Sequence, residues 1–268
     1  MISSDLKNLI EKFNEISKEK WIPSVNMGTG SVGLTFENEL SKNPDSVFFP
    51  DYNGIELKCT TRFSKFPFSL FSISFDGPTF PEIDRIVNLY GYYDYKYPDK
   101  KVLRVDLKAN EIRKSHNYKF KLFLDKKNNK MFLEVYDLFD SLIERKSFVY
   151  LDKIIERLNL KLRNLAIIHG SRKIINDLEY FRYYELDAYK LRDNNIFLDL
   201  IEEGKIFVTL ESRIGKSGYN DGKYKNKNLV FKIEREHLDE LFYKICTINT
   251  DYNIDRIISK DSNFYIMR

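Results

Sequence analysis

Short segments in which apolar and polar residues alternate are interleaved, along most of the chain, with short segments of helical periodicity. Alternation at every second residue is typical of a strand with one buried face, and a spacing of three and four residues is typical of an amphipathic helix. The clearest strand pair covers 118–124 and 131–136, joined by a turn rich in Asp, Lys and Asn. The clearest helix places Leu6, Leu9 and Phe13 on one stripe. We therefore expect an α/β protein with a mixed β-sheet and flanking helices.

The same two periodicities predict the other elements. Further helices are expected at 34–40, 81–90, 151–158, 196–203 and 235–245, and further strands at 55–60, 68–75, 102–109, 165–168, 180–186, 205–214 and 229–233. A loop rich in glycine and lysine separates the last two strands. No repeat and no linker rich in Pro, Gly or Ser divides the sequence, so residues 1–268 are expected to form a single domain.

Composition excludes several classes of protein. The 44 Lys and Arg residues nearly balance the 40 Asp and Glu residues, which argues against a disordered tail or a polybasic arm. No segment approaches the roughly 18 apolar residues of a membrane span, and the first residues lack the features of a signal peptide. Cys59 and Cys246 belong to no CxxC motif. We expect a cytoplasmic protein without a membrane partner, and a sequence pI near 8.7 permits a nucleic-acid partner.

Residues 28–33 read GTGSVG, which matches the glycine pattern of dinucleotide-binding loops. That fingerprint requires a strand directly before it, whereas residues 1–21 have helical periodicity. We therefore interpret the segment as a loop that leads into the N-terminus of a helix.

A second motif, PDYNGIELK at 50–58, has the residue types of a divalent-metal site. Glu56 and Lys58 share one face of the predicted strand, and Asp51 precedes it across an Asn-Gly turn. The upstream helix adds Glu37 as a third acid. Carboxylate oxygens suit Mg²⁺, and a water activated there, beside the lysine ammonium, could attack a phosphodiester.

An acid-x-Lys triplet alone is common in this chain, and one rival is serious. Asp99 is followed by Asp106 and Lys108 on another alternating strand. The first copy is favoured because its two acids are separated by a tight turn and because Glu37 is available. Asp99, by contrast, lies in a stretch of Tyr, Lys, Pro and Asp that is typical of an ordinary surface loop.

The sequence resembles the MvaI/BcnI family of type II restriction endonucleases, relatives of the mismatch-repair nickase MutH among the PD-(D/E)XK nucleases. The resemblance is carried by GSVGLTFE at 30–37, Pro-Asp at 50–51 and GIELK at 54–58. It continues more weakly through LEVYD at 133–137 and ESRIG at 211–215. It implies a monomeric, Mg²⁺-dependent enzyme of the PD-(D/E)XK (MutH-like) fold that acts on double-stranded DNA, with a catalytic lobe and a recognition lobe around a DNA cleft.

By this resemblance, Asp51, Glu56 and the Leu57 carbonyl bind the metal, Lys58 orients or deprotonates the attacking water, and Glu37 supports the site. The catalytic lobe would cover roughly 1–175 and the recognition lobe roughly 176–246. The tail at 247–268 has isoleucines at roughly helical intervals and no readable role.

The loop between the last two strands is a basic hairpin tip that either stays solvated or enters a DNA groove. The resemblance favours the second reading, with lysines on phosphates and Arg213 on a guanine. In the family an Asp-x-Arg reads bases, and here Glu211 and Arg213 occupy those positions. Positions that are usually His and Arg are lysines here, so the resemblance does not fix the target sequence. The expected DNA-binding residues are Glu211, Arg213, Lys216, Tyr219, Lys223, Lys225 and Lys232.

We predict a sequence-specific endonuclease that leaves 5′-phosphate and 3′-hydroxyl ends, with a DNA methyltransferase as its genetic partner. Two alternatives remain open: a MutH-like nicking enzyme of DNA repair, and a DNA-binding module that does not cleave. The three histidines show no metal-binding spacing, and His169, at the end of a buried strand, is interpreted as a structural residue.

Overall fold

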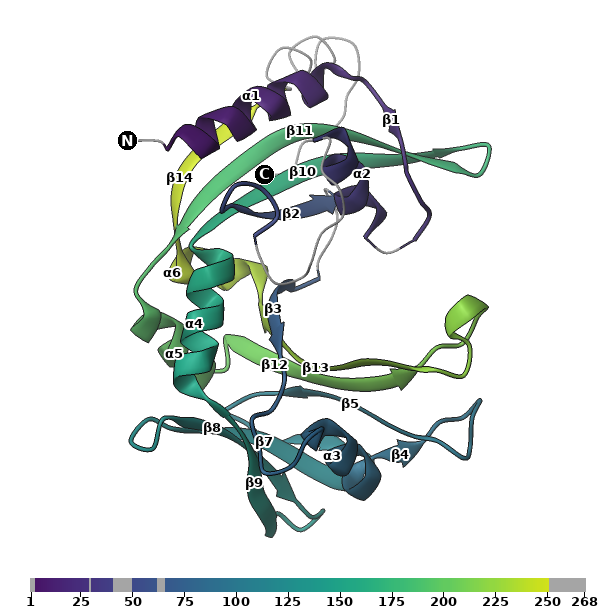
Figure 1. Ribbon diagram of the computed structural model, residues 1–268, viewed down its shortest axis with the longest axis vertical. Helices are drawn as coiled ribbons and strands as arrows, with labels where there is room; N and C mark the ends of the chain where they lie inside the picture. The colour runs from purple at the N-terminus through teal and green to yellow at the C-terminus, as the bar shows by residue number, and fades with distance from the viewer. Residues whose placement is uncertain (1–2, 29, 41–49, 62–65, 251–268) are drawn as a thin grey trace, which may run out of the picture. The chain divides into compact units, whose positions relative to one another are not determined.

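The computed structural model describes residues 3–28, 30–40, 50–61 and 66–250 (Figure 1). Its contacts divide the chain into two compact units, and both are discontinuous in sequence. The first unit comprises residues 1–65, 160–191 and 242–268, and the second comprises 66–159 and 192–241. Each unit therefore contains segments from both sides of residue 175. Which unit cleaves and which reads DNA stays a prediction.

The first unit is a five-stranded sheet covered by helices. Its strands are β1 (Ile22–Pro23), β2 (Glu56–Thr61), β10 (Asn164–Ile175), β11 (Leu178–Leu191) and β14 (Phe242–Asn249). The sheet order is β1-β11-β10-β2, with β14 also paired to β11. Strand β2 runs parallel to β10, whereas β1, β10 and β14 each run antiparallel to β11. The helices are α1 (Ser4–Lys18) and α2 (Ser31–Glu39).

The core of the first unit lies between these helices and one face of the sheet. Helix α1 begins at the N-cap Ser3, whose hydroxyl accepts from the Leu6 amide at 3.2 Å. Its apolar stripe packs against Leu57 and Ile168 of the sheet and Phe36 of α2. Since side chains alternate along a strand, Glu56 and Lys58 of β2 lie on the sheet face opposite Leu57.

The second unit contains two sheets. The five-stranded sheet has the order β3 (Phe68–Ile73), β13 (Tyr224–Ile233), β12 (Ile206–Ile214), β5 (Lys101–Leu107) and β4 (Tyr92–Tyr93). The four-stranded sheet is a meander of β6 (Arg113–Ser115), β7 (Tyr118–Asp125), β8 (Lys130–Tyr136) and β9 (Leu142–Tyr150). The helices are α3 (Glu82–Tyr90), α5 (Asn194–Glu202) and α6 (Leu238–Leu241). Two 3₁₀ turns lie at Gly218–Asn220 and Arg235–His237. Helix α4 (Leu151–Leu162) begins in the second unit, and its last residues belong to the first.

Aromatic packing and one buried carboxylate organise the second unit. The Phe71 and Phe231 rings stack with centroids 4.8 Å apart, and Phe197 of α5 lies 5.9 Å from each. Glu82, at the start of α3, is buried and accepts hydrogen bonds from Arg85, from the Ser147 hydroxyl at 2.6 Å and from Thr79. These contacts connect α3 to the β9 strand of the meander.

The mixed α/β class is confirmed, and most predicted elements are present. The helix predicted at 235–245 is confirmed only over 235–241, and its last residues were wrongly predicted: the helical segment ends at Leu241, and residues 242–249 form β14. Pairing with β11 outweighs the local periodicity, because this strand extends a sheet whose core it helps to cover. The strands predicted at 165–168 and 180–186 are parts of one long hairpin, and β9 was not predicted. Residues 251–268 of the tail lie outside the described residues. No helix within the described ranges has the length and apolarity needed to cross a membrane.

Candidate active site

A tight turn brings Asp51 back beside the strand that follows it. Tyr52 and Ile55 exchange backbone hydrogen bonds of 2.9 and 2.7 Å, and the Asn-Gly pair between them has φ angles of 42° and 79°. Asparagine and glycine adopt this left-handed backbone at low strain. The Leu57 amide consequently donates to the Asp51 Oδ2 atom at 3.0 Å. The predicted convergence of Asp51 with strand β2 is therefore present.

Glu56 is a fully buried carboxylate that contacts two lysines. Its Oε1 atom lies 2.5 Å from the Lys58 ammonium and 3.4 Å from the Lys161 ammonium at the end of α4. Its Oε2 atom is buried and has no hydrogen-bond partner among the described residues. Burial raises the pKa of Glu56 above its ordinary range, the Lys58 charge opposes this rise, and the nearby Asp51 adds to it.

The orientation of the Leu57 carbonyl follows from the place of Leu57 on β2. Leu57 lies on β2, which pairs with β10 and with no other strand of the described residues. Its N–H points toward Asp51. Because the N–H and C=O of one strand residue point to the same side, the Leu57 carbonyl also faces the Asp51 side.

Glu37, on helix α2, lies on the Cys59 side of β2, which is the face opposite Glu56 and Lys58. This helix begins after Gly30, which has a left-handed φ of 97°, so the glycine-rich segment serves as a loop leading into a helix, as expected. A Cβ atom on Gly33 would lie 3.9 Å from Glu37 Oε1 and 4.0 Å from the Cys59 Cβ, which places both side chains around this glycine. Burial raises the pKa of the Cys59 thiol, and the negative charges of Glu37 and Asp51 raise it further. Cys59 is thus an inert thiol beside the acids.

The acids of this cluster fit a divalent cation by their chemistry. Glu56 presents a buried oxygen without a hydrogen-bond donor, which is costly unless something binds it. Asp51 and the Leu57 carbonyl supply further hard oxygen ligands, the type that Mg²⁺ prefers. The donor atoms of Asp51, Glu56 and Glu37 are not gathered into one group within 4.8 Å.

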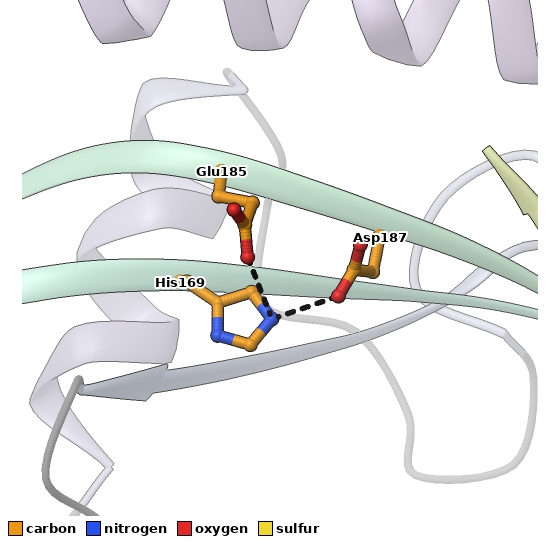
Figure 2. A group of neighbouring side chains, drawn as sticks. All are labelled: His169, Glu185 and Asp187. Atoms are coloured by element: carbon orange, nitrogen blue, oxygen red, sulfur yellow. Dashed lines mark hydrogen bonds and ion pairs between the residues drawn. The ribbon is translucent and has the colours of Figure 1, made fainter. Parts of the chain in front are cut away.

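His169, Glu185 and Asp187 do form such a group, in the sheet of the first unit (Figure 2). The His169 Nε2 atom lies 3.2 Å from Asp187 Oδ2 and 3.9 Å from Glu185 Oε1. The second oxygen of Asp187 accepts from Thr247 and the Lys244 ammonium, at 2.6 and 2.7 Å. Burial favours a higher pKa for Asp187, but the hydrogen bonds with His169, Lys244 and Thr247 outweigh it and lower the pKa to about 2. Because Lys244 already supplies a cation, we interpret the group as a structural network, as expected for His169.

The rival strand holds no comparable cluster in the described part of the chain. Asp106 accepts from the Thr209 hydroxyl at 2.6 Å, whereas Lys108 lies 3.5 Å from Glu111. The two side chains are therefore engaged with different partners.

The predicted DNA-binding residues lie on strands β12 and β13 and on the loop that joins them. Glu211 and Arg213 share one side of β12, where Arg213 Nε is 3.0 Å from Glu211 Oε1 without the alignment of a hydrogen bond. Lys225 is the register partner of Arg213 and therefore lies on the same side. Lys232 is half-buried near the other end of β13, opposite Phe207.

The tip of this hairpin is tied to a second loop, residues 94–100 between β4 and β5. Lys216 is ion-paired with Asp94, so its ammonium binds within the protein. Asp221 accepts from the Lys96 ammonium at 2.9 Å and from the Tyr97 hydroxyl at 2.6 Å. Residues 94–100 form a surface loop, as expected, and Asp99 is exposed in it, but the contacts of Asp94, Lys96 and Tyr97 with the hairpin tip were not predicted. Opposite charges more than a hundred residues apart give no local signal in a sequence.

Two exposed tyrosines lie in these two loops, and each has a lysine ammonium over its ring. Tyr219 is 87% exposed, and the Lys223 ammonium sits 3.6 Å from its ring centroid. Tyr95, in the second loop, is equally exposed, and the Lys216 ammonium lies 4.2 Å from its ring centroid. Neither Tyr95 nor the Lys161 contact with Glu56 was predicted, because both depend on tertiary contacts.

Comparison with known proteins gives concordant results. The model of the MvaI/BcnI restriction endonuclease family matches residues 10–242. A solved structure of restriction endonuclease MvaI in complex with its cognate DNA substrate is 26% identical, with a TM-score of 0.84 over 93% of this chain and 100% of that chain. A structure of MvaI without DNA is 25% identical, with a TM-score of 0.57 over 92% of this chain and 99% of that one. The search of curated proteins finds no match. Because the family model spans most of the sequence, the chain belongs to the MvaI/BcnI restriction endonuclease family.

Proposed function

We propose that this protein is a type II restriction endonuclease that cleaves double-stranded DNA at a specific sequence, with Mg²⁺, to 5′-phosphate and 3′-hydroxyl ends. Family membership and the likeness to a DNA-bound MvaI structure support a site-specific deoxyribonuclease. The observation that carries the proposed chemistry is the buried Glu56 oxygen without a donor, next to Asp51 and Lys58.

Asp51, Glu56 and the Leu57 carbonyl would hold the cation, which when bound lowers the pKa of water and neutralises charge on the scissile phosphate. Lys58 would orient or deprotonate the attacking water and stabilise the negative charge that develops on the phosphoryl oxygens. Its ammonium lies 2.5 Å from Glu56 Oε1, so the side chain proposed to hold the cation would also position the lysine. Glu37, on α2, would support the cluster from the Cys59 side.

We propose that the first unit carries out cleavage and that the second reads the DNA sequence. Arg213 would contact a guanine edge through its paired donors, with Glu211 accepting from a base amino group. Lys223, Lys225 and Lys232 would contact phosphates or acceptor atoms of bases, and Tyr219 would pack against the DNA. Lys216 would hold the tip in place through Asp94 and present its remaining donors to the backbone. The enzyme would act as a monomer, and a methyltransferase would protect the host sites.

The test is cleavage of unmodified plasmid or phage DNA by the purified protein. Discrete fragments in Mg²⁺, and none in EDTA, are expected. Asp51→Ala, Glu56→Ala and Lys58→Ala should each abolish cutting, whereas Asp106→Ala, on the rival strand, should retain it. Normal cutting by all three variants of the 51–58 segment would refute the assignment of the site. Nicked circles without linear product would instead indicate the repair nickase.

A further inference from the structure

The face of the second unit that carries Glu211 extends across strand β5. In the ladder between β12 and β5, Glu211 is the register partner of Arg104. Register partners of an antiparallel pair project to the same side, with Cβ atoms roughly 5 Å apart. The ladder between β12 and β13 adds Asn228 opposite Glu211, and Lys225 opposite Arg213. Three adjacent strands therefore present one polar face.

Arg104 differs from the other residues of its strand. Leu103 and Val105 on either side of it are buried, so the strand is anchored by its opposite face. The Arg104 side chain is exposed, and within the described residues its guanidinium has no hydrogen bond, ion pair or ring contact. The Ser115 hydroxyl donates to the Arg104 backbone carbonyl at 3.4 Å. A rigid strand thus holds an unpaired donor fork beside the Glu211–Arg213 pair.

The difference between lysine and arginine gives this fork a role. The basic residues at positions 225 and 232 are lysines. A lysine provides a point charge, whereas two parallel donors in one plane, which match the O6 and N7 acceptors of guanine, require a guanidinium. The face therefore retains a planar fork on β12 at Arg213 and has a second one on β5.

We propose that Arg104 is a further specificity-determining residue, which reads a guanine in the recognition sequence; this rests on the proposed role of the Glu211–Arg213 face. Arg213 lies two residues beyond Glu211 on β12, so it is the diagonal neighbour of Arg104, at about 7–8 Å. Successive base pairs are about 3.4 Å apart. The two arginines therefore address positions about two base pairs apart.

The experiment measures base preference directly. The site of the wild-type enzyme is first obtained by sequencing the ends that it produces from phage DNA. Duplexes randomised at each position of that site are then cleaved by wild type, Arg104→Ala, Arg104→Lys and Arg213→Ala, and binding is measured over a range of salt concentrations. Lys127→Ala, in the exposed β7–β8 turn of the same unit, is the charge control.

Arg104→Ala is expected to lose discrimination at one guanine by about ten- to a hundredfold, and Arg104→Lys should not restore it. Arg213→Ala should relax a different position. A uniform loss of binding to all duplexes, with a shallower salt dependence that Arg104→Lys repairs, would mean a phosphate contact and would overturn the inference. An unchanged profile for Arg104→Ala, with a relaxed position for Arg213→Ala, would overturn it while leaving the proposed reading face intact. Relaxation by Arg104→Ala alone would support it and remove Arg213 from the proposed function.

Discussion

Asp51→Asn separates the structural role of Asp51 from its proposed role as a metal ligand. The Leu57 amide donates to Asp51 Oδ2 at 3.0 Å, and an asparagine side-chain oxygen can accept the same bond. A hydrogen bond to a charged acceptor contributes about 1.5–3 kcal/mol and a neutral one about 0.5–1.5 kcal/mol, so the variant retains part of this contribution. In metal-free buffer the free energy of unfolding should therefore change by less than about 2 kcal/mol.

Added Mg²⁺ should distinguish the two proteins. A ligand that binds only the folded state at 100 times its Kd stabilises that state by about 2.7 kcal/mol. For a protein of this size that corresponds to a rise in Tm of roughly 5–10 °C. If loss of one anionic ligand weakens Mg²⁺ binding about a hundredfold, the same Mg²⁺ concentration stabilises Asp51→Asn by only about 0.4 kcal/mol, or roughly 1 °C.

The assay is differential scanning calorimetry without DNA, in EDTA and in a series of Mg²⁺ concentrations. Asp106→Asn is the matched control, because Asp106 also accepts a hydrogen bond, from the Thr209 hydroxyl at 2.6 Å, and belongs to the rival acid-x-Lys triplet. It should keep the wild-type response to Mg²⁺. An equal Mg²⁺ response in Asp51→Asn and wild type would refute the reasoning, as would a large loss of stability in EDTA.

Three further predictions concern the packing around the site and the second unit. Lys161→Met leaves the buried Glu56 with one ammonium fewer, so the variant should lose about 1–3 kcal/mol of stability in EDTA. It should gain more stability from Mg²⁺ than wild type does, as measured by urea unfolding. An unchanged unfolding midpoint in EDTA would contradict this prediction. The pKa of Asp187 lies below its ordinary value, at about 2, so its contribution to stability is present above about pH 4 and is lost as the pH falls toward 2. Asp187→Asn should therefore remove about 2–3 kcal/mol of the wild-type acid dependence across that window, and parallel acid titrations of the two proteins would argue against the network. Glu82→Ala leaves Arg85 and Ser147 without their buried acceptor, so the free energy of unfolding should fall by about 3–5 kcal/mol, as measured from the denaturant midpoint. A loss below about 1 kcal/mol would show that Glu144 alone satisfies Arg85.

Local pattern was sufficient for the elements whose side chains interact within a few residues. Three elements are of this kind: the α1 stripe, the 118–136 hairpin and the Asn-Gly turn after Asp51. In each, the interacting residues are separated by one helical turn or by one short loop, so they are neighbours in the sequence as well as in space. Residues 242–249 mark the limit of this approach. Their spacing fits a short helix, but pairing with β11, some sixty residues earlier, makes them a strand.

The sequence by itself determined the class of fold and the content of the candidate site, because Asp51, Glu56 and Lys58 lie within one turn and one strand, and Glu37 lies on the helix just before them. Only the tertiary structure brought Lys161 to Glu56, Asp94 to Lys216 and Arg104 to the side of Glu211. The residues of each pair are separated by about a hundred positions in the sequence. Their contacts depend on strand register or, for Lys161, on where the end of helix α4 lies. Register is a property of the assembled sheet, since the same alternating segment can pair with several neighbours until burial selects one.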